Sequence, residues 1–140
     1  MYKFGRKSAQ RRDECVSALR RVLDRALAYG VMDMSIICGA RLTDEQKQAF
    51  AQGRSKLDGV TKFSKHQVGG NTGRDLSEAV DVVPYPIDWD NKLAFHVMAG
   101  LMFAAAAEEG VKLRWGGDWD GDMSCKDQSF HDLPHFEIVP

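Results

Sequence analysis

Residues 93–107, LAFHVMAGLMFAAAA, form the longest apolar run of the 140-residue chain. The run contains 15 residues, fewer than the roughly 18–20 residues that span a bilayer. We therefore expect no membrane insertion, and instead a buried core helix over residues 89–109 that ends at Gly110. His96 lies within the run, where a hydrogen-bonded core histidine is favoured over a metal ligand.

Patterns on both sides of this helix predict a mixed fold. Apolar residues recur at helical spacing over residues 12–29, and Thr43 and Gln46 form a capping box that opens a further helix. The remaining patterns predict strands at 34–38, 79–83, 113–115 and 135–139, and a long surface loop at 53–78. Because helices and strands do not alternate as βα units, the sequence predicts one α+β domain over residues 1–140.

The composition argues against two classes of protein. The chain has 19 Lys and Arg against 20 Asp and Glu, a net charge of −1, whereas a nucleic-acid binder that neutralises phosphates has a basic excess. The three cysteines, Cys15, Cys38 and Cys125, form no CxxC motif, so we expect free thiols rather than a disulfide scaffold. The first residues lack the apolar segment of a secretory signal. We therefore expect the protein to stay in the cytoplasm unless something else releases it.

Two histidines and one aspartate are candidate ligands of a metal ion. A hydrolytic zinc site needs about three protein ligands and one open position. His66 and His135 supply two nitrogens. Asp81 is the third candidate, because a carboxylate within the apolar run AVDVV is costly unless a cation or hydrogen-bond donors compensate its charge. Taken alone, Asp81 is equally consistent with a hydrogen-bonded structural acid.

The segment DLPHFE, residues 132–137, adds a candidate base. Pro134 favours an extended backbone before it, so Asp132 can lie beside a metal without binding it and take a proton from the attacking water. In an extended strand His135 and Glu137 share a face, which makes Glu137 a candidate acceptor that orients the imidazole. The alternative interpretation is an acidic turn followed by a surface strand.

Six short segments, spread over most of the chain, form an ordered set. They are SIICGARLTDEQ (35–46), AQGRS (51–55), SKH (64–66), AVD (79–81), WGGDW (115–119) and DLPHFE (132–137). Each segment is a weak signal, but their order is specific. In this set the chain resembles a family of zinc peptidases, in particular its phage endolysin branch, which cleaves the L-alanyl-D-glutamate bond of peptidoglycan stem peptides.

The resemblance implies a small α+β domain with a short antiparallel sheet flanked by helices, as in VanY-like and hedgehog-like proteins. It implies a Zn²⁺ ion held by His66, Asp81 and His135, with Asp132 as the catalytic base. Arg41 follows a glycine turn between a strand and a helix, and the resemblance implies that it faces a substrate carboxylate or the developing oxyanion. The alternatives are a D-alanyl-D-alanine carboxypeptidase and a non-catalytic zinc module that binds the cell wall.

The resemblance also implies partners and a place of action. The substrate is bacterial peptidoglycan, and hydrolysis lyses the host of a phage. The enzyme is expected to wait in the host cytoplasm until a separate holin opens the membrane, and then to reach the periplasm and cell wall. A monomer without a separate cell-wall-binding domain is expected.

One spacing departs from the family pattern. Fourteen residues separate His66 from Asp81, more than the family usually has. Residues 68–75 look like an insertion, which a glycine-rich loop absorbs at small entropic cost and which could form a lip over the cleft. Asp81 is favoured as the ligand because its apolar strand context matches the family, and Asp75 is the alternative.

A second acidic group lies near the C-terminus. Asp118, Asp120 and Asp122 have the one, three, five spacing of oxygen ligands that begins a calcium loop. Met123 and Ser129 occupy the places where such a loop has its glycine and its glutamate. A polar loop beside the active site is therefore favoured over a regulatory calcium site.

Overall fold

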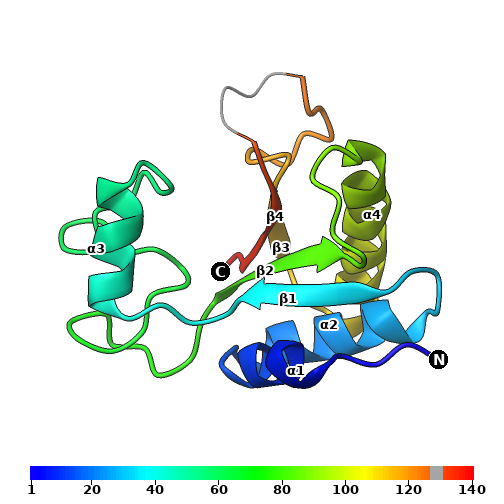
Figure 1. Ribbon diagram of the computed structural model, residues 1–140, viewed down its shortest axis with the longest axis horizontal. Helices are drawn as coiled ribbons and strands as arrows, with labels where there is room; N and C mark the ends of the chain where they lie inside the picture. The colour runs from blue at the N-terminus through cyan, green and yellow to red at the C-terminus, as the bar shows by residue number, and fades with distance from the viewer. Residues whose placement is uncertain (127–130) are drawn as a thin grey trace.

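The computed structural model describes residues 1–126 and 131–140. Its helices and strands are shown in Figure 1, and in chain order they are α1 (Arg6–Asp13), α2 (Ser17–Ala28), β1 (Met34–Cys38), α3 (Thr43–Ala51), β2 (Ala79–Pro84), α4 (Lys92–Glu109), β3 (Leu113–Gly116) and β4 (Asp132–Ile138). None of the helices in the described residues is long and apolar enough to cross a membrane.

The four strands form one antiparallel sheet in the order β1-β2-β4-β3. β2 and β4 are the central pair, and their register aligns Ala79 with Glu137, Val80 with Phe136, and Asp81 with His135. The fold is therefore the small α+β domain with a short antiparallel sheet and flanking helices that the sequence predicts.

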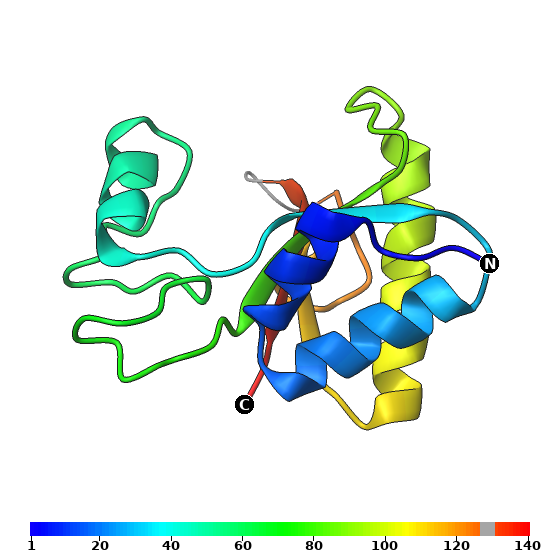
Figure 2. The same ribbon diagram turned by 60° about the horizontal axis from the view of Figure 1, so that its bottom comes forward.

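The hydrophobic core lies between the sheet and the helices α2 and α4, which pack against each other, and Figure 2 shows α2 crossing in front of α4. Side chains alternate across a strand, so Val80, Val82 and Phe136 point into this core and are fully buried. Burial of these apolar side chains fixes which face of the sheet is left for Asp81 and His135.

The predicted helix over residues 12–29 is wrong at its N-terminal end. The chain instead forms α1 and α2, with a break at residues 14–16. At this break the backbone pairs with the long loop. The amide of Val16 donates to the carbonyl of Ser77 (2.9 Å), and the amide of Ser77 donates to the carbonyl of Glu14 (2.8 Å). Because Ser77 is far away in the sequence, the apolar spacing of residues 12–29 cannot predict this pairing.

The predicted capping box of Thr43 and Gln46 is also wrong. Thr43 is already the first residue of α3, so the residue that caps the helix is Leu42. Leu42 precedes the helix, and its backbone amide donates to the carboxylate of Glu45 (2.9 Å). Gln46 is fully buried and uses its side chain for longer contacts, which are described below.

The central helix ends at Gly110 with left-handed backbone (φ 68°), as predicted, but it begins at Lys92 rather than at residue 89. The expectation that His96 is buried in the core is wrong. His96 is exposed on α4, its ring packs edge-on against Trp115 with centroids 5.3 Å apart, and its Nδ1 lies 2.7 Å from the carbonyl oxygen of Lys92. The helix buries one side against the sheet, and His96 lies outside that side.

Residues 53–78 form no helix or strand, as predicted, but this segment is not simply a surface loop. Ser64, His66, Gln67 and Ser77 within it are buried. Together with α3 the segment forms a separate part of the molecule, residues 42–78, which we call the α3 lobe. Figure 1 shows the α3 lobe at the left, beyond the start of β2 and away from the other helices.

Candidate metal centre

Three side-chain atoms from distant parts of the chain converge on one point. His66 Nε2 lies 3.1 Å from Asp81 Oδ1 and 3.2 Å from His135 Nδ1, and His135 Nδ1 lies 3.2 Å from Asp81 Oδ1. All three residues are buried. The structure thus brings together the three ligand candidates of the sequence, and we call these residues the His66–Asp81–His135 cluster.

Strand pairing positions two members of this cluster. Asp81 on β2 and His135 on β4 are direct cross-strand partners, so their side chains lie on the same face of the sheet. That face is opposite to the one that buries Val80 and Phe136. The apolar residues of the two strands therefore determine where the polar pair points.

His66 is positioned by hydrogen bonds to the segment that follows β1 rather than by regular structure. The backbone amide of Arg41 donates to the His66 carbonyl (2.8 Å), and His66 Nδ1 lies 2.7 Å from the carbonyl oxygen of Gly39. A Cβ atom at Gly39 would lie 2.5 Å from the carbonyl oxygen of Arg11, so this close approach of α1 requires glycine. The end of β1 is thereby placed beside the His66 ring.

The outer nitrogens of both imidazoles face hydrogen-bond acceptors. His66 Nδ1 faces Gly39, as described above, and His135 Nε2 lies 2.8 Å from Glu137 Oε1. With a proton on each of these outer nitrogens, the two inner nitrogens carry lone pairs and face a carboxylate oxygen. Three acceptors so close together repel one another unless a positive charge lies among them.

The donor set fits a divalent metal ion. Zinc takes imidazole nitrogen and carboxylate oxygen at about 2.0–2.2 Å in a tetrahedral arrangement, which places the donor atoms roughly 3.3–3.5 Å from each other. The observed separations of 3.1–3.2 Å are close to this spacing. The sulfur of Cys38 lies 3.8 Å from His66 Nδ1, the nitrogen that faces Gly39, and within 4.8 Å of a carboxylate oxygen of Asp81.

When no metal ion is bound, protons on the imidazoles supply this positive charge, and the pKa values of the cluster reflect it. Burial lowers the pKa of His66, but the charge and hydrogen bond of Asp81 outweigh this effect and raise that pKa to about 10. Burial acts to raise the pKa of Asp81, yet the charge of His66 and the hydrogen bonds from both imidazoles hold it well below its usual range. The pKa of His135 is raised by its hydrogen bonds to Asp81 and Glu137, against the effect of burial.

Asp132 lies beside the cluster because β4 is irregular near its start. β4 begins at Asp132 rather than at residue 135 as predicted, and the register against β3 jumps from Trp115–Phe136 to Gly116–Asp132. The extra residues of this bulge bring a carboxylate oxygen of Asp132 within 4.8 Å of the donor atoms of Asp81 and His135. Burial and the charge of Asp81 raise the pKa of Asp132.

Arg41 lies on the other side of Asp81. Its guanidinium nitrogen NH2 is 3.7 Å from Asp81 Oδ2, while NH1 donates to Gln46 Oε1 (3.1 Å). Gln46 in turn donates to Ser55 Oγ (2.9 Å) and to the Leu57 carbonyl (2.7 Å). The sequence does not predict these hydrogen bonds of Gln46. It also does not predict that Arg54 lies at the site, although Arg54 belongs to the AQGRS segment of the resemblance.

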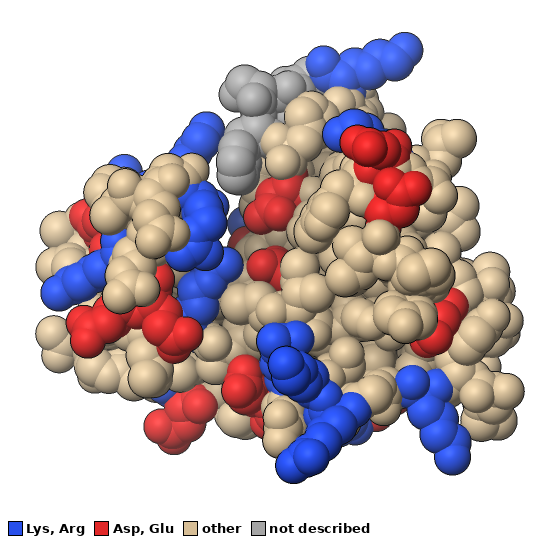
Figure 3. All heavy atoms as spheres, viewed as in Figure 1, with Lys and Arg blue, Asp and Glu red and all other residues tan. Residues whose placement is uncertain are grey.

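Three cavities that share Arg41 and Arg54 surround the cluster, with volumes of about 640, 510 and 230 Å³. The largest has Asp81 and Asp132 on its wall and continues over apolar and aromatic side chains, namely Ile37, Trp89, Phe95, Leu133 and Pro134. Figure 3 shows the hollow between the α3 lobe and the rest of the molecule, with basic side chains on the lobe and acidic side chains across from them.

The other candidates of the sequence lie outside the cluster. Asp75 is exposed and belongs to none of the groups of close ligand atoms among the described residues. His131 is exposed and lines the largest cavity. No residue of the 68–78 segment lines any of the three cavities, so the structure does not support the hypothesis that this segment forms a lip over the cleft.

Asp118, Asp120 and Asp122 come together as a second acidic group, with carboxylate oxygens within 4.8 Å of one another. Asp118 is buried and accepts a hydrogen bond from the amide of Met123 (2.9 Å), whereas Asp120 and Asp122 are exposed. Ser129 lies outside the described residues. A calcium ion at this group stays a prediction.

Comparison with known proteins adds sequence and structural relatives. A family model described as phage L-alanyl-D-glutamate peptidase matches residues 1–139. The L-alanyl-D-glutamate peptidase of Escherichia phage T5 is 32% identical over 144 aligned positions, covering 99% of this chain and 98% of the relative. The peptidoglycan L-alanyl-D-glutamate endopeptidase CwlK of Bacillus subtilis (strain 168) is 27% identical, covering 84% of this chain and 68% of the relative. The crystal structure of the L-Ala D-Glu endopeptidase ChiX of Serratia marcescens is similar with a TM-score of 0.72 and 25% identity, over 99% of this chain and 90% of that chain.

Proposed function

The chain belongs to the phage L-alanyl-D-glutamate peptidase family, and we propose that it hydrolyses this bond of peptidoglycan with one zinc ion held by His66, Asp81 and His135. The peptidase activity follows from the family and from the named relatives. The observation that carries the zinc assignment is the set of three donor atoms that lie 3.1–3.2 Å from one another. When bound there, zinc supplies Lewis acidity for the scissile carbonyl and the attacking water.

Asp132 is the proton carrier of the proposed mechanism. It is not needed as a ligand, since three donors already face one another, and its carboxylate opens onto two of the cavities. Its carboxylate lies within 4.8 Å of donor atoms of Asp81 and His135, close enough to accept a proton from a water at the cluster. A carboxylate oxygen of Asp132 accepts a proton from the attacking water and passes it to the amine of the departing D-glutamyl residue.

Arg41 and Glu137 act through charge and orientation. The guanidinium of Arg41, beside Asp81, faces the cavities and stabilises the negative charge that develops on the carbonyl oxygen of the substrate. Glu137 accepts the Nε2 proton of His135 and so keeps Nδ1 directed at the cluster.

Metal content tests the proposed ligand set directly. Wild-type protein is expected to bind one zinc ion with an anomalous signal at the zinc edge between His66, Asp81 and His135. His66→Ala and His135→Ala are expected to lose the ion and the release of soluble fragments from purified peptidoglycan. Asp75→Ala is the matched control and is expected to keep the zinc ion and the release of fragments. Loss of zinc from Asp75→Ala would identify Asp75, and not Asp81, as the ligand.

The biological setting is proposed from the family alone. The chain acts as a monomer, and hydrolysis lyses the host after a separate holin lets the enzyme pass from the host cytoplasm to the cell wall. Expression in the host without a holin is expected to leave cells intact, and co-expression with one is expected to lyse them. Lysis without a holin would reject this route, and a dimer in size-exclusion chromatography would reject the monomer.

A further inference from the structure

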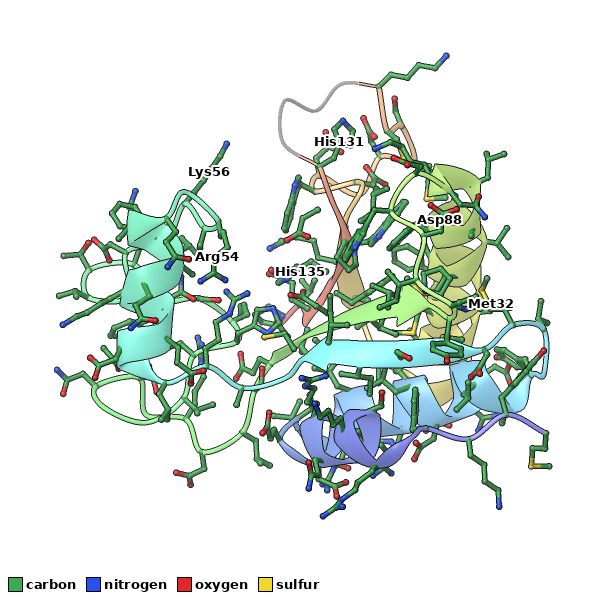
Figure 4. All side chains as sticks on the ribbon, in the orientation of Figure 1. Met32, Arg54, Lys56, Asp88, His131 and His135 are labelled. Atoms are coloured by element: carbon green, nitrogen blue, oxygen red, sulfur yellow. The ribbon has the colours of Figure 1, made fainter. Side chains whose placement is uncertain are left out.

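Arg54 lies at the junction of the three cavities, outside the residues to which the mechanism above gives a role. Arg41 and Arg54 are the two residues that line all three of these cavities. Figure 4 shows Arg54 and His135 on opposite sides of the space between the α3 lobe and the sheet, and both residues line the cavity of about 230 Å³. Arg54 therefore borders each of the three cavities around the metal cluster.

The side chain of Arg54 is attached to a well-held part of the lobe. Its backbone amide donates to the carbonyl of Ala49 at the end of α3 (2.8 Å), and the next residue, Ser55, accepts the hydrogen bond from buried Gln46. Nε donates to the side chain of Gln52 (2.8 Å). The backbone beside Arg54 is thus fixed by the same glutamine that holds Arg41.

The charge of Arg54 is not used by a protein partner. Arg41 faces Asp81, and Lys65, which lines the small cavity together with Lys56, pairs with Glu78 (3.3 Å). Within the described part of the chain no carboxylate pairs with Arg54, which is exposed. Its terminal guanidinium nitrogens are therefore available to an anion in the cavity.

The substrate carries such an anion next to the bond that is cut. The peptide continues from the D-glutamyl residue through one of its two carboxyl groups, and the other carboxylate remains on the residue that supplies the leaving amine. This carboxylate comes close to Asp132, whose negative charge repels it, and a cation across the cavity offsets this repulsion. The net charge of the chain is −1, so this attraction has to be local.

We propose that Arg54 binds the free carboxylate of the D-glutamyl residue and is a specificity-determining residue of the peptidase. This proposal rests on the proposed function. It gives the two arginines of the cleft different tasks: Arg41 faces the charge that develops during the reaction, and Arg54 faces the charge that the substrate already carries.

The test uses three N-acetylated L-alanyl-D-glutamyl peptides: one with a free α-carboxylate and an amidated side chain, one with a free side-chain carboxylate and an amidated α-carboxyl, and one with both groups amidated. Wild-type kcat/KM for the better carboxylate peptide is expected to exceed that for the diamide by about tenfold, since charged hydrogen bonds exceed neutral ones. Arg54→Ala is expected to remove this preference, so that its kcat/KM falls more on the carboxylate peptide than on the diamide. Arg54→Lys restores part of it, because lysine keeps the charge without the planar fork.

Lys62→Ala is the control, since it removes a positive charge from the α3 lobe at a residue that lines none of the three cavities. Equal loss on all three peptides in Arg54→Ala, no loss on any, or the same selective loss in Lys62→Ala overturns the proposal. Affinities of the same peptides for Asp132→Asn, measured by calorimetry, must show the same preference and the same dependence on Arg54. Binding to Asp132→Asn requires no turnover. The affinities therefore test the Arg54 assignment even if the proposed peptidase mechanism fails.

Discussion

The two halves of the metal cluster are built by different means. Asp81 and His135 lie on paired central strands, and the apolar side chains of those strands fix their face and register. His66 lies in a segment without helix or strand, and individual hydrogen bonds to Gly39 and Arg41 hold it in place. The backbone of the sheet half is therefore expected to keep its position when a single polar contact is lost, whereas the backbone of the α3 lobe is expected to respond to each one.

The largest expected effect is on catalysis at the sheet half. Asp132→Asn keeps the size of the side chain but removes the proton acceptor, so kcat is expected to fall about 1000-fold while zinc stays bound. Asp75→Asn, on the exposed loop of the α3 lobe, is the matched control and should change kcat less than about twofold. An Asp132→Asn enzyme of normal kcat would remove Asp132 from the mechanism.

The same Phe→Ala change in the two halves compares how they are stabilised. Phe136 on β4 is fully buried and stacks with Trp115, so Phe136→Ala is expected to lower the free energy of unfolding by about 3–5 kcal/mol. Phe50 on α3 is 47% exposed, and Phe50→Ala is expected to cost about 1 kcal/mol or less. Urea unfolding with saturating zinc measures both, and equal losses would contradict the proposed difference between the halves.

The sequence predicts the sheet half better than the α3 lobe for a physical reason. Strands β2 and β4 bury apolar residues at alternate positions, so their location can be predicted from local pattern, and an aspartate within such a run is conspicuous. The start of β4 at Asp132 was missed because the bulge at Pro134 depends on the register with β3. Such a register is set by the partner strand and not by the residues of β4 alone.

The α3 lobe has no such pattern. His66 is a candidate ligand by residue type alone, and the resemblance implies its role, since nothing periodic surrounds it. The contacts of Gln46 with Arg41, Ser55 and Leu57 join residues through buried polar groups, and local spacing suggested an N-terminal cap instead. Long-range polar contacts of this kind are specified by the fold and are visible only in it.

A smaller effect is expected from the residue that orients His135. Glu137→Gln keeps an oxygen acceptor for His135 Nε2 but removes its negative charge, so zinc affinity is expected to fall about 10-fold, at the lower end of the range for such partners. Glu78→Gln removes the same charge from a residue that pairs with Lys65 and Arg74, and it should leave zinc affinity unchanged. Titration with a competing chelator measures both, and unchanged affinity in Glu137→Gln would show that Glu137 does not tune the imidazole.

A change at Gln46, with an expected effect of similar size, tests the α3 lobe without touching the sheet. Gln46→Glu retains an acceptor for Arg41 but loses the amide that donates to Ser55 and Leu57. Gln46→Ala loses both, and its kcat/KM is expected to fall about 10-fold, the loss of one charged hydrogen bond, while Gln46→Glu loses less. Hydrogen exchange should increase at residues 55–59 in both variants and stay unchanged in β2 and β4, because the pairing of these strands does not involve Gln46. Increased exchange in β2 would mean that the two halves unfold together. It would contradict the view that apolar packing holds the sheet independently of the hydrogen bonds that hold the α3 lobe.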